Sequence, residues 1–308
     1  MRDARTWSSA GVPVVQAGSW GHAFGRVDVT IDRATRHVTG TRLFAPRELC
    51  EWEEATTARC NPPSGGVAPR YEGRAVSVDS AVEAAMAPGL SRVREIRAAP
   101  LGVTLETRLS RTPHPESALA NLFADALRDG TPGAEAAVSY GAGGGGLRAD
   151  LPAGPLLAGA LYDVFPFDNR VVRVTLTGAQ IRTILTDQLR RRGRVTGLSG
   201  LRAEVSCVRG EIGVHLVRDS GRAIGSTERI VVAAPDFAVR ALGAPASLAA
   251  VEGTMPRPTD LPLVREVVAD WLKSRSSPLR QEQFFDAASP RWRFAPGASL
   301  CLSAGNRG

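Results

Sequence analysis

The sequence predicts an α+β protein in which layered mixed sheets pack against helices. Strand-like and helix-like segments alternate irregularly, which favours mixed sheets over a doubly wound parallel sheet. The clearest element is a helix over residues 116–129, where Leu119, Leu122 and Leu127 recur at helical spacing. Composition is that of a globular protein, because 43% of the 308 residues are hydrophobic and 22% are charged.

The first third of the chain is expected to hold short strands and loops. Residues 12–16 and 26–31 have the character of strands, and residues 37–44 are expected to pair with the second of these in a hairpin. Residues 46–75 are loop-like, with adjacent prolines and adjacent glycines. The acidic side chains of this loop, Glu53 among them, are expected to lie on a solvated face.

A helix is predicted over residues 79–97, where Val82, Met86 and Val93 share one apolar face. Pro88 lies inside this segment and is expected to kink or split the helix, because it lacks an N–H and its ring clashes with the preceding turn. The helix would connect two globular parts. Further strands are predicted at 102–109, 134–140, 170–176, 201–208, 212–217 and 229–234, and further helices at 179–192 and 263–272.

The net charge of +7 comes almost entirely from arginine, and it is spread along the chain except for a cluster at residues 190–194. This cluster follows a helix-like segment, where cations suit the helix C-terminus, and no nucleic-acid-binding motif accompanies it. No apolar run is long enough to span a bilayer. The sequence therefore predicts neither a nucleic acid nor a membrane as a partner.

The four cysteines fit no paired zinc-binding template. Cys50 and Cys60 bracket a short polar loop that is typical of a local disulfide, and Cys207 and Cys301 are available for a second. An even number of cysteines indicates an oxidising compartment, whereas residues 1–18 show no apolar segment typical of a signal peptide. The cellular location therefore stays open.

The stretch 139–169 is the candidate functional region. Four consecutive glycines begin at Gly143 and let another group approach the backbone closely. Arg148 adds a forked cation suited to phosphate or carboxylate. Phe167 follows a proline in a polar turn that ends at Asn169. Together these residues predict a small-molecule pocket, with a nucleotide as the natural ligand, and the alternative is a flexible loop before an ordinary strand.

The motifs ESALANL, RADL, VFPFDN and VTLTGAQI, in this order, resemble the C-terminal domain of the 5'-nucleotidase family over roughly residues 104–272. That family includes the UDP-sugar hydrolases and ecto-5'-nucleotidases. The segment PVVQAGSWG at residues 13–21 is similar to the closing strands of the family's metallophosphatase domain. The resemblance implies remnant metallophosphatase strands in residues 1–45, a loop and helical connector in 46–103, and a nucleotide-recognition domain in 104–308.

The resemblance also implies a binding site for a nucleoside or nucleotide. Its base would stack between Phe167 and Phe237, and stacking on an aromatic ring is worth about 1–3 kcal/mol per base. Arg148 would hold phosphate or ribose, and Arg111 is the nearest candidate for the family's second arginine. Asn169 completes the P-F-x-N element and joins the predicted binding residues.

Two positions depart from the family pattern. The family usually has asparagine five positions before the loop arginine, where this chain has Gly143. It usually follows the second phenylalanine with G-G-D-G, whereas Phe237 is followed by AVRALGAPAS, with no aspartate at that spacing. Two polar contacts to the nucleoside are therefore in question, and the base and sugar preferences stay open.

The family's hydrolysis uses two divalent metal ions held by D-x-H, G-N-H-E/D and G-H-x-H motifs. None of the four histidines lies in such a motif, so we assign this chain no catalytic residue and no metal ligand. One hypothesis is the recognition half of a secreted or periplasmic phosphohydrolase, read from a truncated frame or from a wrongly assigned start. The other is a stand-alone or degenerate nucleotide-binding module, whose chemistry is lost or supplied by a partner chain. In either case the chain alone is expected to be inactive.

Overall fold

The computed structural model describes residues 5–9, 12–18, 21–56, 60, 64–112, 116–141, 146–192, 195–241, 261–298 and 301. The chain divides into two units, Met1–Ala87 and Pro88–Gly308. The boundaries implied by family resemblance, at residues 45 and 103, stay predictions.

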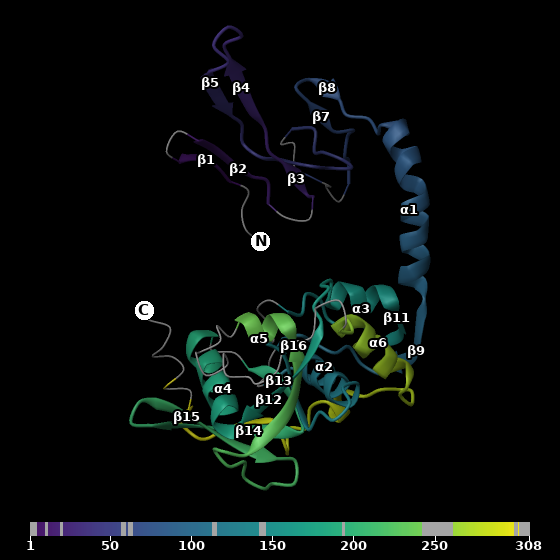
Figure 1. Ribbon diagram of the computed structural model, residues 1–308. Helices are drawn as coiled ribbons and strands as arrows, with labels where there is room; N and C mark the ends of the chain where they lie inside the picture. The colour runs from purple at the N-terminus through teal and green to yellow at the C-terminus, as the bar shows by residue number, and fades with distance from the viewer. Residues whose placement is uncertain are drawn as a thin grey trace. The chain divides into compact units, whose positions relative to one another are not determined.

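The first unit is built from antiparallel strand pairs (Figure 1). The pairs are β1 (Arg5–Ser9) with β2 (Val12–Gln16), β3 (Ala23–Phe24) with β6 (Arg47–Glu48), β4 (Val27–Ile31) with β5 (Val38–Leu43), and β7 (Arg70–Tyr71) with β8 (Arg74–Ala75). The predicted hairpin of residues 26–31 with 37–44 is confirmed by β4 and β5.

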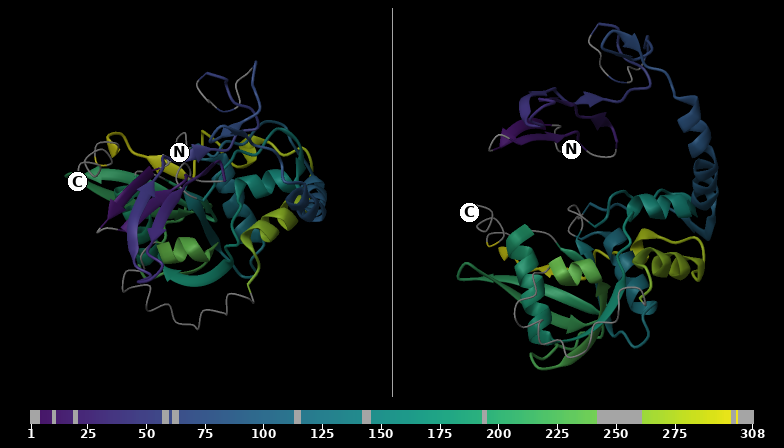
Figure 2. Two further views of the ribbon diagram at one scale, coloured as in Figure 1. Left: turned by 90° about the horizontal axis from the view of Figure 1, so that it is seen from above. Right: turned by 45° about the horizontal axis from the view of Figure 1, so that its top comes forward.

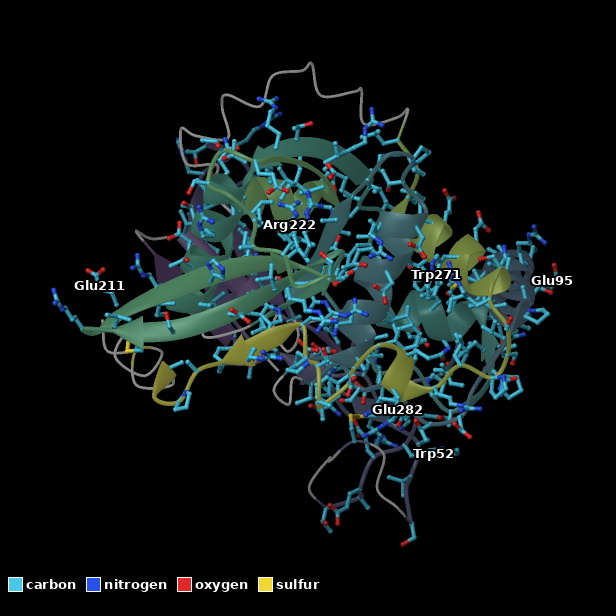
Figure 3. The ribbon with its side chains drawn as sticks, turned by 90° about the horizontal axis from the view of Figure 1, so that it is seen from below. Trp52, Glu95, Glu211, Arg222, Trp271 and Glu282 are labelled. Carbon is cyan, nitrogen blue, oxygen red and sulfur yellow. A yellow bond between two sulfur atoms is a disulfide. The ribbon has the colours of Figure 1, made fainter. Side chains whose placement is uncertain are left out.

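In the described part of residues 46–75, one carboxylate is buried where the sequence predicts an exposed one. Glu53 is only 7% exposed, and its carboxylate accepts hydrogen bonds from Arg47 Nη2 at 2.5 Å and from the Arg70 backbone N–H at 3.2 Å. The prediction of a solvated face was therefore wrong for Glu53. A disulfide joins Cys50 to Cys60, and a second joins Cys207 to Cys301 (Figure 3), so both expected pairs are confirmed.

Helix α1 (Ser80–Ala98) runs without interruption through Pro88, so the predicted split does not occur. None of its residues is buried, and Val82, Met86 and Val93 are each about half exposed. Its apolar stripe is therefore not a core face. Among the described residues, no helix combines the length and apolar character needed to cross a membrane.

The second unit is built around a four-stranded mixed sheet with the order β12 (Val171–Thr177), β16 (Arg229–Pro235), β10 (Ala136–Gly141) and β13 (Thr196–Ser199). The β10–β16 pair is parallel and the other two pairs are antiparallel. A three-stranded sheet orders β15 (Glu211–Arg218), β14 (Leu201–Val208) and β17 (Trp292–Phe294), and β9 (Pro100–Leu105) pairs with β11 (Gly154–Leu157). This arrangement confirms the predicted α+β class with mixed sheets.

Helices pack on both faces of the four-stranded sheet (Figure 2). Helices α2 (Ala118–Asp129), α4 (Gly178–Arg192) and α5 (Asp236–Ala241) contact its strands. Helix α3 (Ala158–Val164) packs mainly on β11 and α6, and α6 (Val264–Lys273) packs on α2 and β9, with a short 3₁₀ turn at Gln281–Gln283. Alternate residues of β10 enter different cores: Ala137 packs in the cluster of α2 and α6, whereas Ala136 and Val138 pack in the cluster of α4. The sheet is therefore the middle layer.

Helix α2 is fixed against this sheet by its cap and by one close approach. Ser117 Oγ accepts a hydrogen bond from the Ala120 N–H, which satisfies a free donor of the first turn. Leu119 and Leu122 are fully buried, as their spacing predicts. A side chain at Gly197 would place Cβ only 2.0 Å from the Ala120 carbonyl oxygen, so glycine there lets α2 lie directly on β13.

Candidate functional site

Arg148 and Phe167 lie together beside α3. The Arg148 N–H donates to the Val164 carbonyl at 2.8 Å, which returns the chain from the glycine run to the end of that helix. The Arg148 guanidinium carbon lies 5.1 Å from the centroid of the Phe167 ring, and that ring packs edge-on against Phe165 at 5.4 Å. Gly143 lies outside the described residues.

Arg111 joins the same cluster. Its Nη1 donates to the carbonyl oxygen of Arg148, and its backbone N–H donates to Asp150 Oδ1 at 2.9 Å. Asp150 also faces Arg108, whose Nη1 lies 3.4 Å from the carboxylate. Two guanidinium groups, those of Arg108 and Arg111, thus lie near the single carboxylate of Asp150, and the Arg148 guanidinium adds a third cation over Phe167. This excess of positive charge suits an anionic group such as phosphate.

Asn169 is joined to the start of α5 by a hydrogen bond to Asp236. The Asn169 side-chain amide donates to Asp236 Oδ1 at 3.1 Å, and the same oxygen accepts the backbone N–H groups of Arg170 at 3.1 Å and Phe237 at 2.7 Å. One carboxylate therefore joins the turn before β12 to the start of α5. The Asn169 amide nitrogen is engaged within the protein, so this residue supports the turn.

Phe237 stands on the surface, with 58% of its area exposed, in the first turn of α5. The antiparallel pairing of Val171 with Pro235 puts the turn before β12 and the helix after β16 at one end of two neighbouring strands. The strand register therefore brings together the regions of Phe167 and Phe237, which are 70 residues apart in the sequence. An exposed phenylalanine ring there offers an apolar face to a ligand.

Tyr140 lies beneath this region and is only 6% exposed. Its ring centroid is 4.8 Å from that of Phe165, and a Cβ at Gly146 would come within 2.2 Å of its ring. Among the residues that the structure describes, its hydroxyl has no hydrogen-bond partner. Burial, together with the negative charge of Asp236, raises the pKa of the Tyr140 hydroxyl, so the ring stays neutral.

Two carboxylates that were not among the predicted binding residues, Asp150 and Asp236, bind the segments that carry Arg148 and the two phenylalanines. Asp236 immediately precedes Phe237 at a helix start, which is a typical capping position. Asp150 follows Arg148 by two residues in the RADL motif. A helix-start aspartate and a motif aspartate are local sequence signals from which Asp236 and Asp150 could have been predicted as site residues.

A metal centre cannot be assembled from the described part of the chain, where no group of three or more histidine, cysteine, aspartate or glutamate side chains is placed to hold an ion. His22 is exposed in its turn, and His114 lies outside the described residues. The described residues therefore do not fit the two-metal site that the resemblance implies for the rest of the family.

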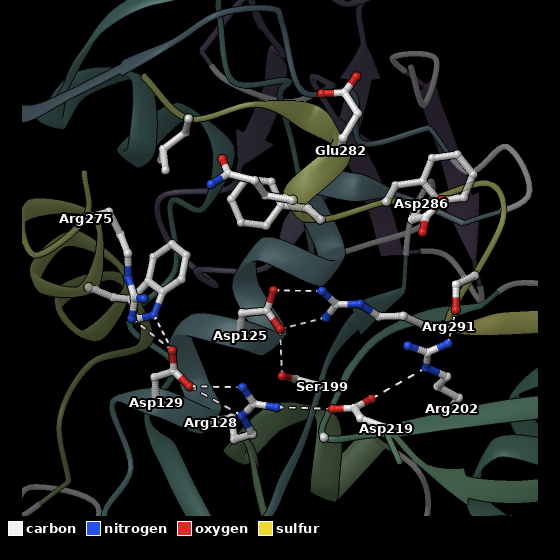
Figure 4. Close-up of a pocket in the computed structure, with 17 residues that line it drawn as sticks. Asp125, Arg128, Asp129, Ser199, Arg202, Asp219, Arg275, Glu282, Asp286 and Arg291 are labelled. Atoms are coloured by element: carbon white, nitrogen blue, oxygen red, sulfur yellow. Dashed lines mark hydrogen bonds and ion pairs between the residues drawn. The ribbon is translucent and has the colours of Figure 1, made fainter. Parts of the chain in front are cut away.

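A polar cavity of about 540 Å³ lies elsewhere in the second unit, between α2, the start of β14 and the segment after α6 (Figure 4). Ion pairs line it in a row, from Arg275 to Asp129, Arg128, Asp219 and Arg202. A bidentate pair of Arg291 with Asp125 lies alongside, at 2.7 and 2.8 Å. The arginines of this cavity are thus matched by carboxylates of the same chain.

Known proteins share both sequence and fold with this chain. Residues 98–240, which hold all five predicted binding residues, match the family model described as 5'-nucleotidase, C-terminal domain. Over 179 residues the chain is 26% identical to the endonuclease YhcR of Bacillus subtilis (strain 168), an alignment covering 57% of this chain and 12% of that protein.

Two solved structures from Thermus thermophilus share the fold. The 5'-nucleotidase precursor of that organism superposes with a TM-score of 0.57 and 21% identity, covering 95% of this chain and 54% of that one. The sulfate thiohydrolase SoxB of the same organism superposes with a TM-score of 0.52 and 19% identity, covering 95% of this chain and 48% of that one. The chain thus spans about half the length of these structures. The family match over residues 98–240 and the shared fold both agree with the predicted resemblance to the 5'-nucleotidase C-terminal domain.

Proposed function

We propose that the second unit recognises a nucleoside 5'-phosphate. The base stacks on the rings of Phe167 and Phe237, and the phosphate or ribose lies against Arg148 and Arg111. The observation that carries the proposal is the position of Arg148, whose guanidinium lies over the Phe167 ring and has no carboxylate partner among the described residues. A free cation beside an aromatic ring matches the two ends of a nucleotide.

The wider role that we propose is substrate recognition for a 5'-nucleotidase-like phosphohydrolase. The family match and the shared fold support this role, and the two metal ions would come from a metallophosphatase domain outside the residues present here. The alternative is a binding module without hydrolysis, which is favoured by the lack of a metal-holding group among the described residues. In both cases the purified chain with added Mn²⁺ should release no phosphate from AMP. Adding a metallophosphatase domain distinguishes the two, because only a recognition half should increase the release of phosphate by that domain.

Calorimetry of the purified chain with AMP tests the binding proposal. Phe167→Ala and Phe237→Ala should each weaken AMP binding by about tenfold, since each removes one stacking surface. Val208→Ala is the control, because it truncates an apolar side chain that is 63% exposed on β14, away from the site. Binding that both phenylalanine variants leave at the wild-type affinity would contradict the base clamp.

A further inference from the structure

Residues 165–169, which we call the phenylalanine turn, join α3 to the segment before β12. Arg265 contacts this turn from the first turn of α6, which lies beside α3 (Figure 1). Its Nη1 donates to the carbonyl oxygens of Phe165 at 3.3 Å and Phe167 at 3.0 Å. Its Nη2 donates to Asp168 Oδ1 at 3.0 Å. One guanidinium therefore holds three acceptors within four consecutive residues.

The two halves of this turn are held in different ways. Backbone hydrogen bonds fix its second half, from the Val264 N–H to the Asn169 carbonyl at 2.9 Å and from the Val171 N–H to the Pro262 carbonyl at 3.0 Å. The first half, which carries Phe167, receives the donors of the Arg265 side chain. A forked guanidinium suits this task, because it bonds several acceptors in one fixed plane.

The surroundings of Arg265 keep it in place. Its side chain is only 21% exposed, and the guanidinium carbon lies 5.0 Å from the centroid of the Tyr162 ring on α3. Arg148 contacts the ring of Phe167, whereas Arg265 bonds the backbone of the same residue. Arg265 thus acts on the orientation of the ring and leaves its surface to the ligand.

We infer that Arg265 is a positioning residue for base recognition, an inference that rests on the proposed nucleotide site. It holds the Phe167 ring in the stacking orientation before the ligand arrives. Without it, the turn would have to be ordered during binding, and that ordering opposes affinity. The effect should appear with ligands that carry a base and be absent with ribose 5-phosphate, which carries none.

Calorimetry with AMP and with ribose 5-phosphate tests the inference on the full chain. Arg265→Ala should weaken AMP binding by about tenfold and leave the affinity for ribose 5-phosphate unchanged. Arg265→Lys should lie between wild type and Arg265→Ala, because lysine keeps the charge but lacks the fork. In a Phe167→Ala background, Arg265→Ala should change AMP affinity less than about twofold, since the ring that it orients is gone.

Arg275→Ala is the matched control. Arg275 follows the other end of α6, packs on the Trp271 ring and pairs with Asp129, so its loss disturbs the same helix without touching the turn. It should bind AMP like the wild type. Hydrogen exchange gives a readout that needs no ligand: exchange across residues 165–171 should rise in Arg265→Ala and stay unchanged in Arg275→Ala.

The outcomes separate the two proposals. Wild-type AMP affinity and unchanged exchange in Arg265→Ala would overturn the inference while leaving the nucleotide site standing. An equal loss of affinity for AMP and ribose 5-phosphate would also overturn it, because that pattern means general disruption. A wild-type protein that binds neither ligand would contradict the nucleotide site and, with it, base recognition as the purpose of Arg265. If Arg265→Ala fails to fold, the same measurements on Arg265→Lys decide.

Discussion

Two arginine-rich regions of the second unit use the same side chain in opposite ways. In the polar cavity of Figure 4, Arg275 pairs with Asp129 at 2.9 Å and Arg291 with Asp125 at 2.7 Å. At the phenylalanine turn, Arg148 lies on an aromatic ring, and the described part of the chain provides it no carboxylate.

The difference separates a structural network from the proposed binding site. A guanidinium already neutralised by a carboxylate must give up that partner before it can bind an external anion, so the cavity mainly joins α2 to the C-terminal segment. An unpaired guanidinium at the surface keeps its field and its donors for a ligand. We therefore propose the turn, and not the cavity, as the ligand site.

The largest effect is expected on breaking a pair in the cavity. Arg291→Ala should lower the free energy of unfolding by about 3 kcal/mol, because it leaves the Asp125 carboxylate largely buried without its cation. The Asp125 side chain is only 16% exposed. Urea denaturation measures the loss, and AMP affinity per folded molecule should not change. A variant as stable as the wild type would show that this network does not hold the fold.

Removing the unpaired cation of Arg148 should lower AMP affinity and leave the free energy of unfolding nearly unchanged. Arg148→Ala should weaken AMP binding by about tenfold, corresponding to a charged hydrogen bond to phosphate, and change the free energy of unfolding by less than about 0.5 kcal/mol. Calorimetry at two salt concentrations should also show a weaker salt dependence than in the wild type. A large loss of stability in this variant would mean that Arg148 is structural and would remove the contrast with the cavity.

The smallest effect concerns pH and the Asp129 carboxylate of the cavity. Burial alone would raise the pKa of Asp129, but the hydrogen bond from Trp271 Nε1 and the cations Arg128 and Arg275 bring it below its ordinary value. A carboxyl whose pKa is lower in the folded protein stabilises the fold above its unfolded pKa, and that stability is lost as pH falls through the folded pKa.

Asp129→Asn should therefore flatten the pH dependence of the melting temperature below about pH 4, where the aspartate would otherwise be protonated. Thermal unfolding followed by circular dichroism from acid to neutral pH checks this. Equal acid sensitivity in Asp129→Asn and the wild type would show that the ion-pair row contributes nothing to acid stability.

Several elements followed from local pattern. The apolar spacing of α2 predicted its buried face, and the short separation of Cys50 and Cys60 predicted their bond. Pro88 shows the limit of a local rule, because α1 continues through it. Glu53 shows a second limit. It is buried with hydrogen bonds from Arg47 and Arg70, and the residues around the glutamate in the sequence do not predict those partners.

The sequence by itself determined the chemistry of the candidate site: a glycine run before Arg148, an aromatic turn at Phe167 and an aspartate–phenylalanine pair that ends with Phe237. Tertiary structure decided how these parts meet. The register of β12 against β16 aligns the two segments, and the Asp236 carboxylate joins them. Arg265 contacts the turn from nearly a hundred residues away. Local sequence specifies turns and faces, whereas strand register and long-range side-chain partners depend on the packing of the whole domain.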